Sequence, residues 1–180
     1  MSRSVSFFGA MRQSSPGGSE HERWVSLDLA AVTVRRAELG DAERMTAFVL
    51  DVAEKSFMRE FSAEGQANFR VQHSVERMME RLHGGYRYRL AEQDGELVGL
   101  IGIRGNTHLY HLFVAPVVQG RGLGRRLWEA EKAESLRMGA RSFTVNASLN
   151  AIGVYERFGF VVAGPMQDLG GLRFVPMRLG

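Results

Sequence analysis

Cysteine is absent from the sequence, and no apolar run approaches the ~20 residues that a helix needs to cross a bilayer. The lack of thiols excludes disulfide bonds, thiolate nucleophiles and thiolate metal ligands, and it fits a cytoplasmic protein without requiring one. The short apolar runs exclude membrane-spanning segments from the expected fold. What is present, 44% hydrophobic and 24% charged residues in a chain of 180, is the composition of one soluble globular domain.

Lysine is also scarce, since Lys55 and Lys132 are the only two among 23 basic residues. Arginine therefore carries nearly all of the positive charge, with a pI of ≈ 9.7 on a chain of net charge +3. Two alternatives would explain this bias: a GC-rich coding genome, or phosphate recognition by guanidinium groups. The excess charge is concentrated in residues 114–141, whereas a nucleic-acid binder spreads basic residues over a broad face. We expect a small anionic ligand and no nucleic-acid partner.

The first 30 residues are different in character from the rest of the chain. A stretch of serine, proline and glycine from Ser14 to Ser19 is turn-rich and contributes nothing to a core. We therefore expect a flexible leader over residues 1–30 and a single domain over residues 31–180. No group of His, Asp or Glu in the sequence has the spacing of a metal site, so no metal is expected.

Hydrophobic periodicity and turn residues predict strands and helices over residues 31–180. The expected order is strand 32–38, helices 41–56 and 74–82, strands 86–92, 97–103 and 107–114, helix 123–138, strand 142–147, helix 150–158, and strands 160–163 and 173–179. Asp41 is expected to cap the first helix, and an Asp94-Gly95 turn between two apolar runs is a strong hairpin signal.

A glycine-rich segment joins the strand at 107–114 to the helix that follows. It places Gly120, Gly122 and Gly124 where a helix begins, with Arg121 and Arg125 between and after them. The first N–H groups of a helix lack carbonyl partners and the helix dipole adds positive potential, so such a turn can hold a diphosphate. A glycine-rich connector with solvated arginines is the alternative interpretation.

Two other phosphate-binding patterns do not fit this segment. A Walker loop needs Lys and a hydroxyl residue after the glycines, but Arg125 and Arg126 follow Gly124. A dinucleotide fingerprint needs a different glycine spacing and an acidic residue about 20 positions on, and residues 140–148 contain no carboxylate.

The segment Gln119-Gly120-Arg121-Gly122-Leu123-Gly124, preceded by Leu112-Phe113-Val114-Ala115-Pro116, resembles the Gln/Arg-x-x-Gly-x-Gly/Ala motif of the GNAT superfamily of N-acetyltransferases. Asn150, Ala151 and residues 155–160 resemble the second half of that family's cofactor region. The resemblance covers roughly residues 32–179. It implies an α/β (α+β) fold with a mixed, mostly antiparallel sheet of about six to seven strands, splayed between the fourth and fifth strands, and helices on both faces.

The resemblance also implies the residues of an acetyl-coenzyme A site. The backbone of Val114 would bond the acetyl carbonyl, and Tyr155 would be the general acid for the departing thiolate. The expected cofactor-binding residues are Leu112, Phe113, Val114, Gln119, Gly120, Arg121, Gly122, Leu123, Gly124, Arg125, Asn150 and Tyr155.

The general base and the acceptor side are less defined by the resemblance. His108 and His111 on the cofactor strand are candidate bases, with His111 preferred, and Glu54 and Glu60 lie near the expected acceptor side. A water chain with no dedicated base is the alternative. The candidate acceptor residues are Phe57, Asn146, Ser148 and Arg173, of which Arg173 could pair with an acceptor carboxylate.

These expectations lead to one function and one alternative. The chain is expected to be an N-acetyltransferase that moves the acetyl group of acetyl-coenzyme A directly to a primary amine of a small molecule, an amino acid or a peptide terminus. The alternative is an acyl-coenzyme A sensor with the same fold and no turnover. A homodimer is a further expectation, since the family often forms one, and no membrane partner is expected.

Overall fold

The computed structural model describes residues 29–180, so the leader expected over residues 1–30 lies almost wholly outside the described residues. The strands are β1 (Thr33–Arg36), β2 (Arg87–Gln93), β3 (Glu96–Arg104), β4 (His108–Val114), β5 (Phe143–Ser148), β6 (Val161–Val162), β7 (Gln167–Leu169) and β8 (Leu172–Leu179). The helices are α1 (Ala42–Ser56), α2 (Ala63–Gln72), α3 (Val75–His83), α4 (Leu123–Arg137) and α5 (Ile152–Arg157).

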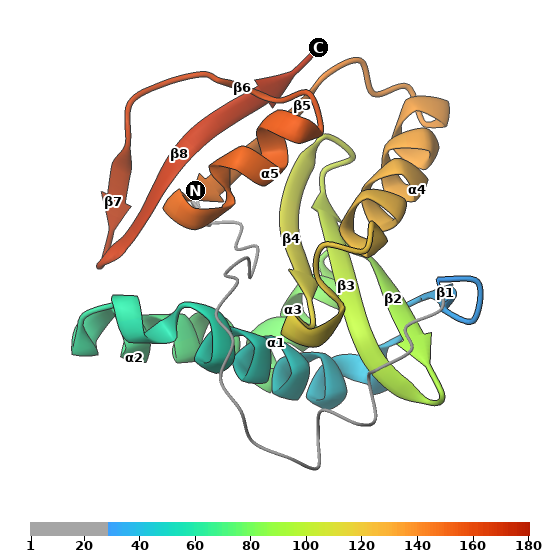
Figure 1. Cartoon of the computed structure of the whole chain (residues 1–180), viewed down its shortest axis with the longest axis horizontal. Coiled ribbons are helices and arrows are strands. Elements are labelled where there is room, and N and C mark those ends of the chain that lie inside the picture. The colour runs from blue at the N-terminus through green and yellow to red at the C-terminus, as the bar shows by residue number, and fades with distance from the viewer. Residues whose placement is uncertain (1–28) are drawn as a thin grey trace.

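The strands form one sheet with helices on both faces. Its order is β1-β2-β3-β4-β5-β8-β6, with β7 also paired to β8, and every pair except β4–β5 is antiparallel. Figure 1 shows α1, α2 and α3 along one side of the sheet and α4 and α5 on the other. The predicted mixed, mostly antiparallel sheet with helices on both faces is confirmed.

Strands β4 and β5 are the point at which the sheet opens. Their parallel pairing is limited to His108 with Thr144 and Leu109 with Val145, so residues 110–114 of β4 have no partner in β5. The predicted splay between the fourth and fifth strands is therefore confirmed. Because β4 still pairs with β3 on its other side, its open edge is held in place.

Two hydrophobic cores fix β4 between the helix layers. On one side Trp128 of α4 packs with Phe143 and Phe160 at ring-centroid distances of 5.1 and 5.3 Å, in a cluster that includes Leu112 and Val114. Phe113 belongs to the opposite cluster, under α1, α2 and α3. The alternation of side chains along a strand accounts for this division, and all seven residues of β4 are buried.

Buried ion pairs hold α4 against the sheet. The Arg89 Nε atom lies 2.7 Å from Glu131 Oε1, and Glu131 is 0% exposed. Arg87 donates from Nη2 to the Ser135 hydroxyl at 2.7 Å. These contacts between β2 and α4 orient the helix whose first residues follow the glycine-rich segment.

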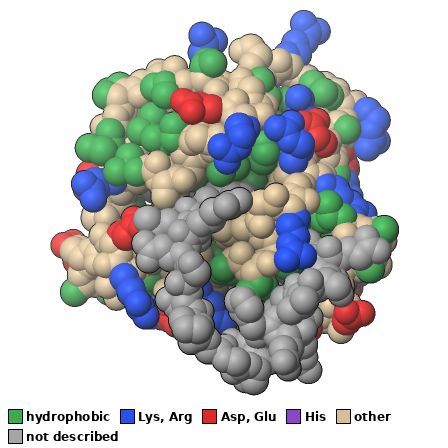
Figure 2. Space-filling view, in the orientation of Figure 1, with side chains coloured by type: hydrophobic (Ala, Val, Ile, Leu, Met, Phe, Trp, Pro, Cys, Tyr) green, Lys and Arg blue, Asp and Glu red, His purple; other side chains and the backbone are tan. Residues whose placement is uncertain are grey.

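The face of the molecule drawn in Figure 2 shows no continuous basic patch among the described residues. On the face that Figure 2 shows, Lys and Arg side chains stand apart or in small groups among neutral and apolar ones. Among the described residues, no helix is long and apolar enough to cross a membrane.

Three local features differ from the sequence-based expectation. The structure contains α2 and β7, which the sequence pattern did not predict, so the sheet has eight strands. Glycine disfavours a helix, and Gly65 lies within α2. A Cβ at Gly65 would be only 3.3 Å from the Gly171 carbonyl oxygen, so the glycine allows the β7–β8 turn to pack closely against the helix. The Asp41 side chain makes no cap to α1; it accepts from the Glu38 N–H at 2.8 Å and from Arg35.

Candidate active site

The open edge of β4 presents backbone hydrogen-bonding groups to the splay. The Ala115 N–H donates to the Val98 carbonyl of β3 at 3.0 Å, and this bond shows which residues of β4 direct their backbone groups toward β3 and which direct them away from it. Since successive residues face opposite sides, Phe113 bonds toward β3, whereas Leu112 and Val114 direct their N–H and C=O groups toward the gap. The Val114 carbonyl accepts from the Gln119 side-chain amide at 2.8 Å. An extended chain could add to this edge as a strand does.

The glycine-rich segment ends in a helix N-terminus without a side-chain cap. Gly120 and Gly122 have φ values of +75° and +91°, in the region that favours glycine, and Gly122 is the N-cap residue of α4. The Arg126 N–H donates to the Gly122 carbonyl at 3.0 Å, so the N–H groups of Leu123, Gly124 and Arg125 precede the first intrahelical bond. Together with the helix dipole, these donors form a site for an anion.

The arginines around this segment do not all face it. Arg121 is exposed beside the turn. Arg125 donates from Nη2 to the Arg157 carbonyl at 2.7 Å, and its guanidinium lies 5.5 Å from the Phe158 ring centroid. The Arg125 side chain therefore joins α4 to α5, and a contact of this residue with an anion at the turn would come from its backbone N–H.

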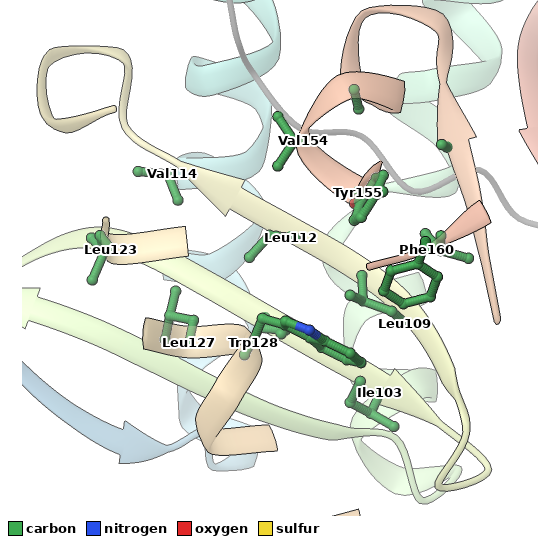
Figure 3. Close-up of a cluster of buried hydrophobic side chains, with 14 of the residues drawn as sticks. Ile103, Leu109, Leu112, Val114, Leu123, Leu127, Trp128, Val154, Tyr155 and Phe160 are labelled. Atoms are coloured by element: carbon green, nitrogen blue, oxygen red, sulfur yellow. The ribbon is translucent and has the colours of Figure 1, made fainter. Parts of the chain in front are cut away.

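Tyr155 lies on the side of β4 that carries α4 and α5. It is 0% exposed, and its ring centroid lies 5.8 Å from that of Phe160. Figure 3 shows Val154 and Tyr155 of α5 on the same side of β4 as Leu112. The structure thus brings Tyr155 next to the strand whose edge faces the splay.

The predicted acceptor residues largely converge on one pocket. It has a volume of ≈ 40 Å³ and is lined by Phe57, Glu60, Phe61, Ser148, Leu149, Asn150 and Arg173. Asn150, predicted to contact the cofactor, lines it as well and accepts from the Ser148 hydroxyl at 2.6 Å. Asn146 lies on the same face of β5 as Ser148 but does not line this pocket.

Of the two acidic candidates, one is at the pocket and one is not. Glu60 lines it, beside Phe61. Glu54 is exposed and pairs with Arg70 at 2.7 Å, outside the pocket lining. The ring centroids of Phe57 and Phe61 lie 5.7 Å apart, and both rings pack against Phe69 of α2.

His111 is part of a buried hydrogen-bond chain on the opposite side of β4 from Tyr155. Its Nε2 lies 3.1 Å from His73 Nε2, and its Nδ1 lies 3.0 Å from the Tyr88 hydroxyl. His73 Nδ1 must donate to the Phe69 carbonyl at 2.8 Å, because a carbonyl only accepts. His111 therefore donates from Nε2 to His73 and accepts the Tyr88 proton at Nδ1.

These hydrogen bonds occupy both ring nitrogens of His111, and His111 does not line the pocket of Phe57, Glu60 and Arg173. The side chain is 1% exposed, and burial lowers the pKa of His111 well below its ordinary value. Burial also lowers the pKa of His73 to about 3. Sequence reasoning missed the hydrogen bonds of His73 and Tyr88, because nothing local links the residue that follows α2 to positions on β2 and β4.

His108, the other candidate base, lies where β4 and β5 are still paired. Its Nδ1 is 2.8 Å from the Thr144 hydroxyl oxygen. Burial lowers its pKa to about 4. It sits six positions before the Val114 end of the strand, at the closed end of the splay.

A family profile described as an acetyltransferase (GNAT) domain matches residues 57–180. The chain belongs to the GNAT acetyltransferase family. Its fold is similar to that of a GCN5-related N-acetyltransferase from Rhodopseudomonas palustris, with 24% identity over 82% of this chain and 94% of that chain and a TM-score of 0.70. No curated protein sequence matches significantly.

The similarity to two further solved structures extends over nearly the whole of their chains. The PaiA N-acetyltransferase of Thermoplasma acidophilum, solved in complex with coenzyme A, is 20% identical over 82% of this chain and 98% of that one, with a TM-score of 0.67. Apo YjaB of Escherichia coli is 25% identical over 82% and 96%, with a TM-score of 0.62. The GNAT fold therefore spans the described part of this chain.

Proposed function

We propose that this acetyltransferase moves the acetyl group of acetyl-coenzyme A directly to a primary amine of a small molecule, an amino acid or a peptide terminus. The observation that carries the proposal is the uncapped N-terminus of α4, which follows two glycines of positive φ and adjoins the open edge of β4. One feature can bind a diphosphate and the other an extended pantetheine arm. The absence of cysteine supports direct transfer without an acyl-enzyme.

Different residues would bind the diphosphate and the pantetheine arm of the cofactor. The N–H groups of Leu123, Gly124 and Arg125 would hold the diphosphate, with Arg121 adding charge at the surface. Leu112 and Val114 would bond the pantetheine arm, while Phe113, which bonds toward β3, would contribute no backbone bond to it. Gln119 holds the Val114 carbonyl and so keeps the turn beside the strand end.

The chemistry uses the same strand edge. Acetyl-coenzyme A supplies an activated acetyl group as a thioester. The Val114 N–H would stabilise negative charge on the acetyl oxygen as the amine attacks. Tyr155 would donate a proton to the departing thiolate. The amine must first lose a proton, because its ordinary pKa lies above neutrality, at about 10.4 for a lysine-like amine and about 7.7–8.0 for a peptide terminus.

The pocket favours Glu60 over His111 as the acceptor of that proton. Glu60 lines the acceptor pocket, whereas both ring nitrogens of His111 are bonded within the core. Arg173, which also lines the pocket, could pair with a carboxylate of the acceptor. An aromatic wall from Phe57 and Phe61 would contact the acceptor body.

An acceptor screen tests the proposal. The full chain would be incubated with acetyl-coenzyme A and a panel of amines, with thiol release and product mass as readouts. For an accepted amine, Glu60→Gln should lower kcat/KM by about 10²-fold, whereas Glu54→Gln, its exposed control outside the pocket, should change it by less than about twofold. Coenzyme A binding without thiol release on any amine would favour the sensor alternative.

A further inference from the structure

A second and larger pocket lies away from the acceptor pocket. It has a volume of ≈ 440 Å³ and is lined by residues from the end of α2, from α3, from the position just before β2, and from β4. Its lining residues are Gln72, Arg77, Glu80, Arg81, Tyr86 and Tyr110, none of which lines the acceptor pocket. A volume of this size is within the range of small-ligand sites.

Arg81 gives this pocket a buried positive charge. Its side chain donates from Nε to the Tyr110 hydroxyl at 3.1 Å and from Nη2 to the Gln72 carbonyl, while Nη1 is buried without a hydrogen-bond partner. The residue is 7% exposed, and among residues 29–180 no carboxylate lies within ion-pair distance of it. Buried charges in proteins are normally paired, so this guanidinium lacks an anion.

Tyr110 provides a second donor at the same place. Its oxygen accepts from Arg81, which leaves its own O–H proton to be donated. The guanidinium groups of Arg81 and Arg104 lie 5.1 and 5.8 Å from the Tyr110 ring centroid, so both arginines add positive potential there.

The other lining residues define the charge and shape of a ligand. Arg77 pairs with Glu80 at 2.6 Å, so the lining keeps one net positive charge, and Glu80 would repel a dianion. Tyr86 and Tyr110 pack edge to face at 4.9 Å and form an apolar wall. This combination suits one negative charge on a compact apolar or aromatic body.

We propose that this pocket binds the carboxylate of a small monocarboxylic acid. The carboxylate accepts from the Arg81 guanidinium and the Tyr110 hydroxyl, and the body of the acid packs against Tyr86. The site is separate from acetyl transfer, and its occupation can be measured without turnover, so the outcome does not depend on the proposed function.

Titration of benzoate into the full chain, followed by calorimetry and by NMR, tests the site. Benzoate should bind saturably at one site and shift the Tyr86 and Tyr110 ring signals, while neutral benzamide should bind about tenfold more weakly. Saturable phosphate binding tighter than benzoate, equal affinity for benzamide, or no saturation by benzoate would overturn the proposal. So would competition by coenzyme A or by an accepted amine.

Variants separate binding from folding. Arg81→Gln should weaken benzoate about tenfold, whereas Arg70→Gln, an exposed arginine of α2 paired with Glu54, should leave it within about twofold. Tyr110→Phe keeps the ring and removes the donor, so it should weaken benzoate by about threefold or more even if Arg81→Gln does not fold. A folded Tyr110→Phe variant with unchanged benzoate affinity would refute the assigned contacts.

Discussion

Replacement of Gly122 by alanine tests whether the turn before α4 holds the diphosphate. Gly122 has φ +91° and ψ −2°, and an added Cβ would meet nothing closer than Leu29 Cδ1 at 3.8 Å. The cost is therefore backbone strain of about 1–2 kcal/mol rather than a clash. For a chain of this length, a loss of that size should lower the Tm by roughly 2–8 °C.

The turn can relieve that strain only by changing the backbone that leads into the helix. Such a change moves the N–H groups of Leu123, Gly124 and Arg125, and each charge-assisted hydrogen bond that is lost costs about 1.5–3 kcal/mol. We therefore expect the Kd for coenzyme A to rise by about 10- to 150-fold in a calorimetric titration. Pantetheine, which lacks the diphosphate, should bind the variant and the original protein alike.

Gly40→Ala is the matched control. Gly40 has no positive φ, and a Cβ there would have nothing within 4 Å, so neither Tm nor coenzyme A affinity should change. A folded Gly122→Ala variant that binds coenzyme A as tightly as the original protein would refute the assignment of the diphosphate to this turn. Equal weakening of pantetheine would place the effect on β4 instead.

Three further predictions concern catalysis and stability. Tyr155→Phe should lower kcat by about 10²-fold at unchanged coenzyme A affinity, and an unchanged kcat at every pH would remove the general-acid role. Hydrogen bonds from Arg35 lower the pKa of Asp41. The Arg35–Asp41 pair therefore stabilises the fold above the unfolded pKa of ~3.9, and this stabilisation is lost as the pH falls through the lower folded pKa. Asp41→Asn should lower the free energy of unfolding near neutral pH by about 1 kcal/mol, measured as a lower urea midpoint, and should have no such effect in strong acid. Burial lowers the pKa of His73 to about 3, so between that pKa and pH ~6.5 the unfolded chain binds a proton that the folded chain does not. The free energy of unfolding should therefore fall by up to about 1.4 kcal/mol for each pH unit below ~6.5. Urea titrations of His73→Gln should show a smaller decline over this range.

The features predicted correctly from the sequence are those set by neighbouring residues. The Asp94-Gly95 turn is one, since both residues take positive φ, 52° and 82°, and join β2 to β3. The turn at Gly120 and Gly122 is another, because glycine spacing and the start of a helix lie within a few positions of each other. The order of the elements other than α2 and β7 followed from the same local signals.

Helix α2 was missed because its stabilising contacts are distant in sequence. Its buried residues are Gly65 and Phe69, so it carries no apolar stripe of helical period. Gly65 packs against the β7–β8 turn, and Asn68 donates to the Gly170 carbonyl at 3.2 Å, about a hundred positions along the chain. Neither contact has a signal in the local sequence.

Side-chain roles at the site depend on the same distant contacts. The sequence suggested Arg125 for the phosphates and His111 as a base because of their positions on the helix and the strand. The structure gives the Arg125 guanidinium a carbonyl of α5 and gives His111 two buried partners. Spacing can place a residue on an element, but only tertiary contacts decide which group its side chain meets.

The arginines that follow Val114 were expected to contact phosphate, but two of them bond backbone carbonyls of the protein instead. Arg126 donates to the Leu29 and Val32 carbonyls and Arg125 to the Arg157 carbonyl, so two guanidinium groups join segments of the fold. Among the described residues at this turn, Arg121 is exposed, and its side chain makes no hydrogen bond of this kind to a backbone carbonyl. Binding of a diphosphate would then rest chiefly on backbone N–H groups and the helix dipole, which are fixed by the fold and pay no side-chain entropy on binding.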